Sequence, residues 1–377
     1  MGLEVHSAHG CYIEDTEGHR YLDLISGISV ASLGHGNEKV VEAVRHQAGR
    51  YMHTMVYGEH VQTPQVHLAE RLISLLGPGF ETVYFVNSGS EAIEAAIKLA
   101  KRRTGRFHIG SFRQSYHGST HAAMAAMHDA YYTDAFAPLV PGFVPLDYNN
   151  FDCLERIDHR CAAVLIEPLQ AEAGCRTPVP GFLQALRDRC TEVGALLVFD
   201  EIQTGMGRTG SLFAFQREAV VPDLIVLAKA LGAGMPLGAV AGSEEGFSVL
   251  KDRPVLGHIT TFGGHPVSCA AALAGLEVLM ESNWISEVAD KEARFRERLS
   301  SIPGVSGING RGLMLAIGLE SPERVLRVVA SARSKGVLVD WFLHQPSALR
   351  IAPPLPISED EIEGACALLS AALAETT

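Results

Sequence analysis

The 377-residue sequence predicts an α/β protein, in which a mostly parallel sheet between helices forms a large domain and a smaller α+β domain lies beside it. From about residue 65 to residue 230, short runs of continuous Val, Leu, Ile and Phe alternate with segments of helical spacing. This alternation is typical of a parallel sheet covered on both faces. After about residue 258 the pattern changes to a long Ala/Leu helix followed by mixed segments. A chain of this length also exceeds the usual size of one hydrophobic core.

The elements are expected in the following order along the chain. The opening CYIEDTEGHRYLDL alternates like a hairpin with Glu-Gly at its turn, and NEKVVEAVRHQAGRY has helical spacing. In the large domain we expect helices at VHLAERLISLL, EAIEAAIKLAKR and FLQALRDRCTEVG, and strands at TVYFVNS, CAAVLIEPL, ALLVFDE and PDLIVLAK. The last part adds strands at GRGLMLAIGLE and VLVDWFL, the helix PERVLRVVASARSKG and a final amphipathic helix. We therefore expect an N-terminal segment that contributes to the small domain (1–45), a large domain (46–257) and a C-terminal small domain (258–377).

Charge and composition favour a small-molecule partner. The chain has 31 Lys and Arg against 43 Asp and Glu and carries no block of basic residues, which argues against a nucleic-acid or acidic-membrane surface. The start lacks a basic region followed by an apolar core, and Gly, Pro, Asp or Lys interrupts the most apolar stretches, so we expect a cytoplasmic protein. The seven cysteines form no CxxC pair, which indicates reduced, mostly buried thiols. The sequence has no HExxH motif and no closely spaced His pair, so we expect no metal site.

A phosphate site and a stacking platform are predicted at two strand ends, which is where such sheets bind ligands. Ser88 and Glu91 fit a capping box after TVYFV, and Gly89 lets the backbone approach closely. Free N–H groups and the helix dipole would then point at an anion. Tyr116 and His117, in SYHGS, are suited to stacking on a flat ring. A well-capped helix and a core tyrosine are the simpler structural explanations.

Two buried charges are predicted at the next strand ends. Asp200 follows the apolar run ALLVF, where it needs a positive partner to stay ionised. Lys229 ends the apolar run LIVLA, and a desolvated lysine has a lowered pKa, which makes it a nucleophile and a Schiff-base former. A buried ion pair would explain each residue separately. Together, a phosphate cradle, an aromatic platform, a carboxylate and a lysine are the requirements of pyridoxal phosphate.

These motifs give the sequence a specific family resemblance. Residues 80–275 resemble the class III (ω-amino acid) aminotransferases of the fold type I pyridoxal phosphate enzymes, which include ornithine, acetylornithine and 4-aminobutyrate aminotransferases. The resemblance rests on VNSGSEAIEAAIKLAKR, SYHG, IEPLQAEAG, LLVFDEIQTGMGRTG, PDLIVLAKALGAGMPLGA and TTFGGHP. Weaker similarity extends to GCYIEDTEGHRYLDL and LRIAPPLPIS. It implies a seven-stranded sheet in the large domain and pyridoxal 5′-phosphate as the cofactor.

The resemblance also implies a set of cofactor-binding residues. They are Ser88, Gly89, Ser90, Tyr116, His117, Glu167, Asp200, Gln203, Lys229 and Thr261. Gly89 and Ser90 would hold the phosphate, and Tyr116 would stack on the ring beside His117.

The catalytic residues implied by the resemblance are Lys229 and Asp200. Asp200 would pair with the pyridine nitrogen, Gln203 would hydrogen-bond the ring hydroxyl, and Lys229 would carry the cofactor as an aldimine and act as general base. Thr261 would reach the phosphate of the neighbouring subunit, which implies a homodimer with shared sites. The expected reaction is ping-pong transfer of an amino group from an amino acid or amine donor to a keto acid, with 2-oxoglutarate as the expected acceptor.

Two residues are expected to bind the substrates. Arg350, in LRIAPPLP, matches the arginine with which the family binds the α-carboxylate of glutamate or 2-oxoglutarate. Glu172, in QAEAG, matches the glutamate that masks this arginine when the other substrate is uncharged there. Ser119, however, stands where the family usually carries an arginine for the donor's distal carboxylate, so the donor stays open. His265 replaces the family's usual asparagine, with no evident effect.

Alternative functions exist both with and without this cofactor. A pyridoxal-phosphate-dependent aminomutase of the glutamate-1-semialdehyde type, a decarboxylase and a racemase share the cofactor, although Gln203 favours transfer over the mutase reaction. A nicotinamide-dependent dehydrogenase is suggested by GMGRTG at residues 205–210, which matches GxGxxG. That motif needs its first glycine at the strand end and a helix directly after it, whereas DEIQT intervenes here.

Overall fold

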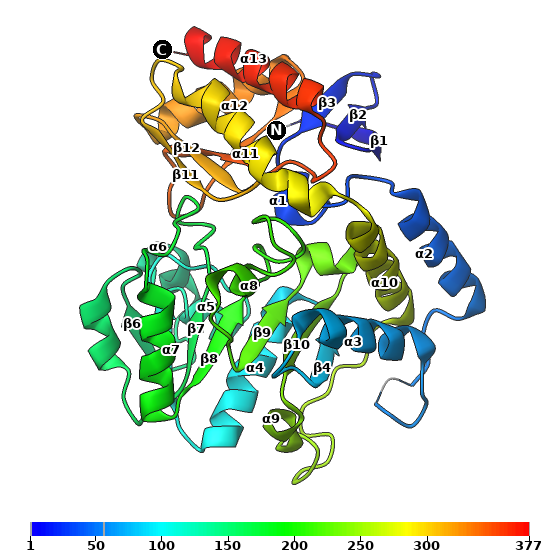
Figure 1. Cartoon of the computed structure of the whole chain (residues 1–377), viewed down its shortest axis with the longest axis vertical. Coiled ribbons are helices and arrows are strands. Elements are labelled where there is room, and N and C mark those ends of the chain that lie inside the picture. The colour runs from blue at the N-terminus through cyan, green and yellow to red at the C-terminus, as the bar shows by residue number, and fades with distance from the viewer. Residues whose placement is uncertain (1, 56, 377) are drawn as a thin grey trace.

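Three β-sheets organise the computed structural model, which describes residues 2–55 and 57–376 (Figure 1). The largest has seven strands in the order β4-β10-β9-β8-β7-β5-β6. Their bounds are β4 Thr82–Val86, β5 His108–Phe112, β6 Phe143–Leu146, β7 Cys161–Ile166, β8 Leu196–Asp200, β9 Leu224–Leu227 and β10 Gly238–Gly242. β10 runs antiparallel to both its neighbours, and the other pairs are parallel. The predicted mostly parallel seven-stranded sheet is therefore confirmed.

The continuous apolar runs arise because helices cover both faces of this sheet. Every residue of β7 and β8 is buried. In β8, Leu197 and Phe199 enter the cluster that includes the apolar face of α7 (Phe182–Val193). Leu196 and Val198 enter the cluster that includes α4 (Gly89–Thr104) on the opposite face. No residue of β8 faces water. The polar residues that come after its apolar run therefore lie at the carboxyl end of the strand.

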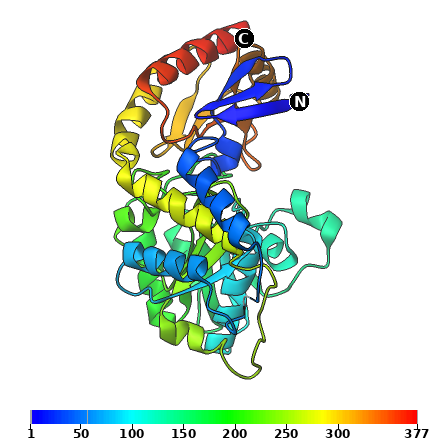
Figure 2. The same cartoon turned by 90° about the vertical axis from the view of Figure 1, so that its right-hand side faces the viewer.

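The smaller part of the chain joins sequence from both ends. The predicted N-terminal hairpin is present as β2 (Tyr12–Asp15) and β3 (Arg20–Asp23), flanked by β1 (Val5–His9). β3 pairs in parallel with β13 (Val337–Leu338). A second sheet has the order β11-β12-β15-β14, with bounds Gly307–Gly310, Leu315–Gly318, Ala348–Ile351 and Asp340–Trp341. Both termini lie in this part (Figures 1 and 2).

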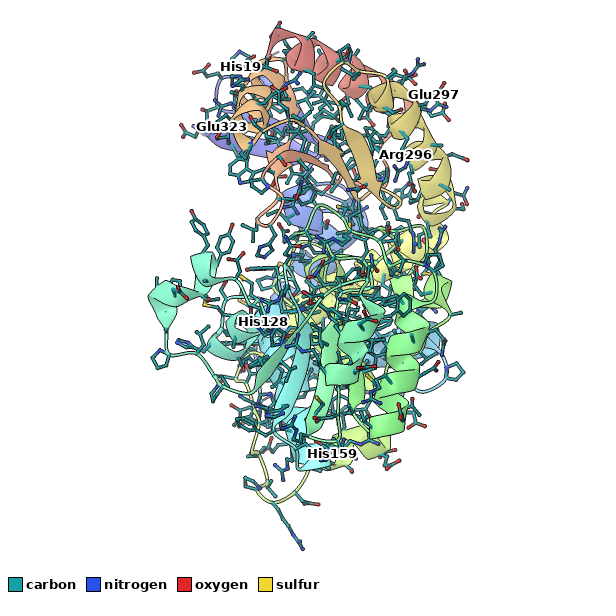
Figure 3. The ribbon with its side chains drawn as sticks, turned by 90° about the vertical axis from the view of Figure 1, so that its left-hand side faces the viewer. His19, His128, His159, Arg296, Glu297 and Glu323 are labelled. Atoms are coloured by element: carbon teal, nitrogen blue, oxygen red, sulfur yellow. The ribbon has the colours of Figure 1, made fainter. Side chains whose placement is uncertain are left out.

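Long helices enclose the sheets. α11 (Trp284–Ser300), α12 (Pro322–Ser334) and α13 (Glu359–Glu375) belong to the smaller part, where Figure 3 places the side chains of Arg296 and Glu323. α10 (Pro266–Glu281) packs against α2 (Glu38–Arg50) and α3 (Thr63–Leu76) beside the large sheet. The short helices are α1 Ser26–Ser29, α5 His121–Ala125, α6 Ala130–Thr133, α8 Ala214–Glu218, α9 Glu244–Ser248, and the 3-10 turns η1 Asp134–Phe136, η2 Phe151–Arg156 and η3 Lys229–Gly232. The domain boundaries proposed from the sequence stay a prediction.

One buried arginine connects the two parts of the molecule. Arg208, in the loop after β8, is completely buried. Its guanidinium donates to Ser32 Oγ at 2.8 Å, to the carbonyl of Leu313 at 3.2 Å and to the carbonyl of Pro353. Burial lowers its pKa to about 10. One guanidinium therefore donates hydrogen bonds to three stretches of chain that are distant in sequence.

The structure also bears on thiols and membranes. All seven cysteines are buried and free, as the composition predicts. Within the described residues, none of the helices is long and apolar enough to cross a membrane.

Candidate active site

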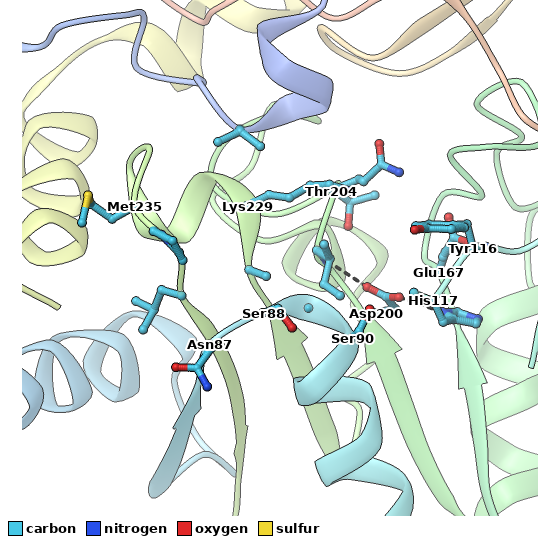
Figure 4. A pocket seen from close by; sticks show the side chains of 18 of the residues that line it. Asn87, Ser88, Ser90, Tyr116, His117, Glu167, Asp200, Thr204, Lys229 and Met235 are labelled. Carbon is cyan, nitrogen blue, oxygen red and sulfur yellow. Dashed lines mark hydrogen bonds and ion pairs between the residues drawn. The ribbon is translucent and has the colours of Figure 1, made fainter. Parts of the chain in front are cut away.

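A cavity of about 430 Å³ lies at the carboxyl ends of β4, β5, β7, β8 and β9 (Figure 4). Nine of the predicted cofactor residues line it, namely Ser88, Gly89, Ser90, Tyr116, His117, Glu167, Asp200, Gln203 and Lys229. The structure thus brings together segments that lie far apart in the sequence. Val30 and Met235 add apolar walls that the sequence did not indicate as functional.

The first part of the site is the N-terminus of α4. Ser88 is the N-cap, and its Oγ accepts from Glu91 N at 3.2 Å. The predicted reciprocal half of the capping box is wrong, because the Glu91 carboxylate accepts from Asn87 N and Asn87 Nδ2, at 2.8 and 2.9 Å. The early N–H groups of a helix have no partner within the helix, and they carry its positive dipole end. An anion is the ligand that suits this turn.

Two glycines keep this turn open. A Cβ at Gly89 would come within 2.8 Å of Ile202 Cδ1. A Cβ at Gly118, where φ is +128°, would come within 2.0 Å of Ser90 Oγ. Ser90 Oγ also accepts from Ser119 N at 3.2 Å, which joins the helix start to the loop after β5. Larger side chains at either glycine would fill the space that a phosphate needs.

Asp200 has a partner within the protein, the imidazole of His117. Its Oδ2 lies 2.7 Å from His117 Nδ1, and its Oδ1 accepts from Ile202 N at 3.0 Å. Both Asp200 and His117 are buried, at 3% and 1% exposure. The two contacts fix the carboxylate at the floor of the cavity. His117 Nε2 is buried without a hydrogen-bond partner among the described residues.

Glu167 supports the loop that carries the aromatic platform. Its carboxylate accepts from Tyr116 N at 3.0 Å and from Ala171 N at 2.7 Å. Burial raises the pKa of Glu167 to about 7, with the negative charge of Asp200 adding to the effect and His117 opposing it. The Glu167 side chain therefore holds Tyr116 in place by accepting from the backbone N–H of Tyr116. The Tyr116 hydroxyl itself lies 3.2 Å from Ser119 Oγ.

Lys229 begins η3 directly after β9, and its side chain lines the cavity (Figure 4). Its φ of +48° is uncommon for a residue other than glycine, and such conformations gather at functional sites. Burial lowers the pKa of the amine, and Arg350 lowers it further, while Glu172 and Asp200 raise it. A lowered pKa increases the fraction of free amine near neutral pH, which is the nucleophilic and basic form.

The predicted substrate pair also forms. Arg350 Nη1 and Nη2 donate to Glu172 Oε1 and Oε2, each at 2.9 Å. Both side chains are buried, so the pair is not a surface contact. Gln203 Nε2 donates to Glu172 Oε1 at 3.1 Å and so connects the pair to the cavity. Burial alone would raise the pKa of Glu172, but Arg350 holds it below its usual range.

A further carboxylate at this pair was not predicted. Asp340 Oδ1 accepts from Arg350 Nε at 3.0 Å. Asp340 and Arg350 face each other across β14 and β15. No sequence motif marks Asp340, and only the strand register brings it to the guanidinium.

Thr261 is the one predicted cofactor residue that the structure does not bring to this cavity. It is exposed; its carbonyl lies 2.9 Å from His53 Nε2 and its Oγ1 lies 3.2 Å from the Tyr57 hydroxyl. His265, four residues on, is the N-cap residue of α10 and packs near Phe262. The role of Thr261 at the phosphate of a neighbouring subunit stays a prediction.

Within residues 2–55 and 57–376, no group of three or more His, Cys, Asp or Glu is placed to hold a metal ion. His128, labelled in Figure 3, instead lies 2.8 Å from Ser111 Oγ, and burial lowers its pKa to about 4. The GMGRTG segment forms consecutive turns, and α8 begins only at Ala214. The dinucleotide-binding alternative therefore lacks the helix it needs.

The residues present fit pyridoxal 5′-phosphate. The turn at Ser88 suits its phosphate, and the platform at Tyr116 suits its ring. Gln203 Oε1 is a buried acceptor without a partner in the described chain, which suits the ring hydroxyl. Asp200 suits the ring nitrogen and Lys229 the aldehyde.

Comparisons with known proteins agree on one group. The family model described as aminotransferase class-III matches residues 1–373. The acetylornithine aminotransferase of Methanopyrus kandleri is 40% identical, over 97% of this chain and 92% of the relative. That of Bacillus subtilis is 39% identical, over 99% and 95%. Among solved structures, the ornithine aminotransferase from Toxoplasma gondii superposes with a TM-score of 0.92 at 30% identity, covering 100% of this chain and 91% of that one. An amine transaminase from an uncultivated Pseudomonas species, in its PLP-bound form, gives 0.93 at 27%, covering 100% and 96%.

Proposed function

Because the chain belongs to the class III aminotransferases, which use pyridoxal 5′-phosphate, we propose that it transfers an amino group from an ω-amino acid or amine donor to a keto acid, with 2-oxoglutarate as the expected acceptor. The observation that carries this proposal is the convergence of Lys229, Asp200 and the Ser88 turn on one cavity. Each side chain alone has a structural explanation, but the three together match one cofactor.

The cofactor residues have distinct roles in this proposal. Ser88, Gly89 and Ser90 would hold the phosphate, Tyr116 would stack on the ring, and Gln203 would accept from the ring hydroxyl. When bound, the cofactor supplies an electron sink for charge that develops on the substrate carbon. Asp200 holds a proton at the ring nitrogen, and the contact between Asp200 and His117 keeps the carboxylate in place for that task.

Lys229 acts in two ways. Its free amine is the group that binds the cofactor aldehyde, which burial favours by lowering the pKa of the amine. With the cofactor and a donor bound, Nζ of Lys229 would take the proton from the amino-bearing carbon as general base. The two tasks need the same neutral form of the side chain.

The pair formed by Arg350 and Glu172 accommodates two unlike substrates in turn. In the half-reaction with the keto acid, Arg350 binds the α-carboxylate through the edge that Glu172 now occupies. In the half-reaction with a donor that has no carboxylate there, Glu172 keeps the guanidinium neutralised. This exchange supports a ping-pong sequence. Because Ser119 carries only a hydroxyl, it does not specify which chemical group stands at the distal end of the donor.

The same proposal includes a homodimer with shared sites. Exposed apolar side chains lie close to Thr261 in sequence, and others lie in the segment around His53 and Tyr57 that contacts it. They are Val255, Leu256, Ile259 and Phe262 in the first group and Met52, Met55 and Val61 in the second. Large exposed apolar surfaces of this kind mark interfaces between proteins. A second copy packed there would cover them and carry Thr261 towards the neighbouring phosphate.

The Phe262→Asp variant tests the dimer. Phe262 is 55% exposed, so the charge should not disturb the core of the subunit, but it would be buried in the interface. We expect sedimentation velocity to show a dimer for the wild type and a monomer for this variant. Leu326→Asp, on α12 and 53% exposed, is the control and should remain dimeric. A monomeric wild type at micromolar concentration would contradict the proposal.

Turnover of the cofactor-loaded protein tests the function directly. Amino acids and amines are screened as donors with 2-oxoglutarate and with pyruvate as acceptors, and the new amino acid is measured. We expect at least one donor to convert 2-oxoglutarate to glutamate. Isomerisation of an amino acid without any acceptor would instead identify the aminomutase alternative.

A further inference from the structure

Arg350 contacts two carboxylates, and each accepts hydrogen bonds from different nitrogens of the guanidinium. Glu172 accepts from Nη1 and Nη2, each at 2.9 Å, whereas Asp340 accepts from Nε at 3.0 Å. Nη2 also donates to the carbonyl of Trp341 at 3.1 Å, and the ring of Phe342 lies 4.5 Å from the guanidinium carbon. One short stretch of chain, residues 340–342, therefore fixes the plane of the guanidinium.

The two carboxylates occupy different N–H groups of Arg350, and this difference decides which of them a substrate must displace. A substrate carboxylate binds a guanidinium through two parallel hydrogen bonds, and Glu172 already uses Nη1 and Nη2 in that way. The substrate must therefore displace Glu172. Asp340 uses Nε and can remain bound, because its strand faces β15 in fixed antiparallel register.

Charge balance is the second consequence of this arrangement. Arg350 is buried, at 3% exposure, and a buried cation that loses its only anion is strongly destabilised. With Asp340 present, the guanidinium keeps one anion while Glu172 is exchanged for the substrate. The same anion repels the incoming carboxylate and so sets how tightly the acceptor binds.

We propose that Asp340 is a positioning residue of the acceptor site, which keeps Arg350 directed at the cavity during the exchange and limits acceptor affinity through its charge. This inference rests on the acceptor role given to Arg350 under the proposed function. The two effects of Asp340 oppose each other, and different substitutions separate them.

The charge of Asp340 changes in an accessible pH range. Burial raises its pKa to about 6, although Arg350 opposes the rise, and the charged groups that face it are Arg350 from β15, Glu172 from the loop after β7 and Asp23 from β3. Cys175, nearby, stays neutral because burial raises the pKa of its thiol. Below about pH 6 Asp340 is protonated and repels the acceptor less. The KM for the keto acid is therefore expected to fall as the pH falls from 7.5 to 5.5.

Two variants of the holoenzyme test the proposal. Asp340→Asn keeps an oxygen that can accept from Arg350 Nε but removes the charge. It should lower the KM for 2-oxoglutarate about threefold to tenfold at pH 7.5 and abolish the dependence of KM on pH, because one close like-charge interaction is lost. Asp340→Ala removes the oxygen too, and it should raise the KM about tenfold or more, because Arg350 loses its anchor. Asp290→Asn, exposed on α11, is the matched control and should change neither value.

The half-reactions and a binding measurement complete the test. With an amine donor that has no carboxylate, the rate of the first half-reaction should stay within about twofold of the wild type in both variants, since Glu172 can still neutralise Arg350. Calorimetric binding of glutarate, a dicarboxylate without a keto group, should follow the same order as the KM values.

Two outcomes would overturn the inference. The first is equal changes in Asp340→Asn and Asp340→Ala. The second is an equal loss in the donor half-reaction, which would indicate a merely structural role. If glutarate binding to the wild type and the two variants follows the expected order but the wild type transfers no amino group, the proposed function fails and the role of Asp340 stands.

Discussion

The Lys229→Ala variant is expected to lose about 10⁴-fold or more of its transfer rate in both half-reactions, because nucleophile and general base are removed together. Lys229 begins η3 at the end of β9, and its amine faces the cavity that contains Asp200 and Tyr116. No other lysine lines this cavity within the described chain. The defect should therefore not be recovered by a neighbouring side chain.

Covalent trapping gives a readout of Lys229 that does not depend on turnover. Borohydride should fix pyridoxal phosphate on the wild-type chain, which mass spectrometry detects, and it should leave Lys229→Ala unmodified at this site. Lys251→Ala is the control, since Lys251 is exposed and pairs with Glu244. Full turnover by Lys229→Ala, or trapping on another lysine in the wild type, would refute the assignment.

The Asp200→Asn variant is expected to lower kcat about 10³-fold, because the amide cannot hold a proton at the ring nitrogen by its charge. The substitution keeps the size of the side chain, and an amide oxygen can still accept from Ile202 N. The loss should therefore appear in the chemical step rather than in folding. Rapid-mixing measurement of the first half-reaction, with the thermal midpoint measured alongside, separates the two.

Asp188→Asn is the matched control for this substitution. Asp188 lies on α7 and accepts from Gln184 Nε2, away from the cavity. It should react at the wild-type rate. If Asp200→Asn were as active as this control, Asp200 would be no more than the buried partner of His117.

The sequence predicted those parts of the structure that local pattern controls. The apolar runs of β7, β8 and β9 and the polar residues after them follow from burial on both faces, so most of the cavity could be inferred. β10 could not, because its Gly- and Ala-rich strand GAVAG has no strong apolar pattern, and its antiparallel direction depends on its neighbours. α11 was missed although its buried positions Val288, Lys291, Phe295 and Leu299 recur at helical spacing.

Contacts between distant segments account for the remaining differences. The Glu91 carboxylate could satisfy Ser88 or Asn87 on local grounds, and the geometry before α4 selects Asn87. The contact of Asp340 with Arg350 depends on the register of β14 against β15, which residue types do not specify. The role of Thr261 depends on a second subunit and stays a prediction.

The buried guanidinium of Arg208 has a consequence for how the molecule comes apart. Its acceptors lie at Ser32, Leu313 and Pro353, so one side chain after β8 adds to the contacts between the N-terminal and C-terminal segments, which also pair directly through β3 and β13. Releasing one of these stretches would leave polar atoms stranded in the others. Calorimetry should accordingly record one cooperative melting event, and limited proteolysis that trims the N-terminal hairpin should loosen the C-terminal sheet as well.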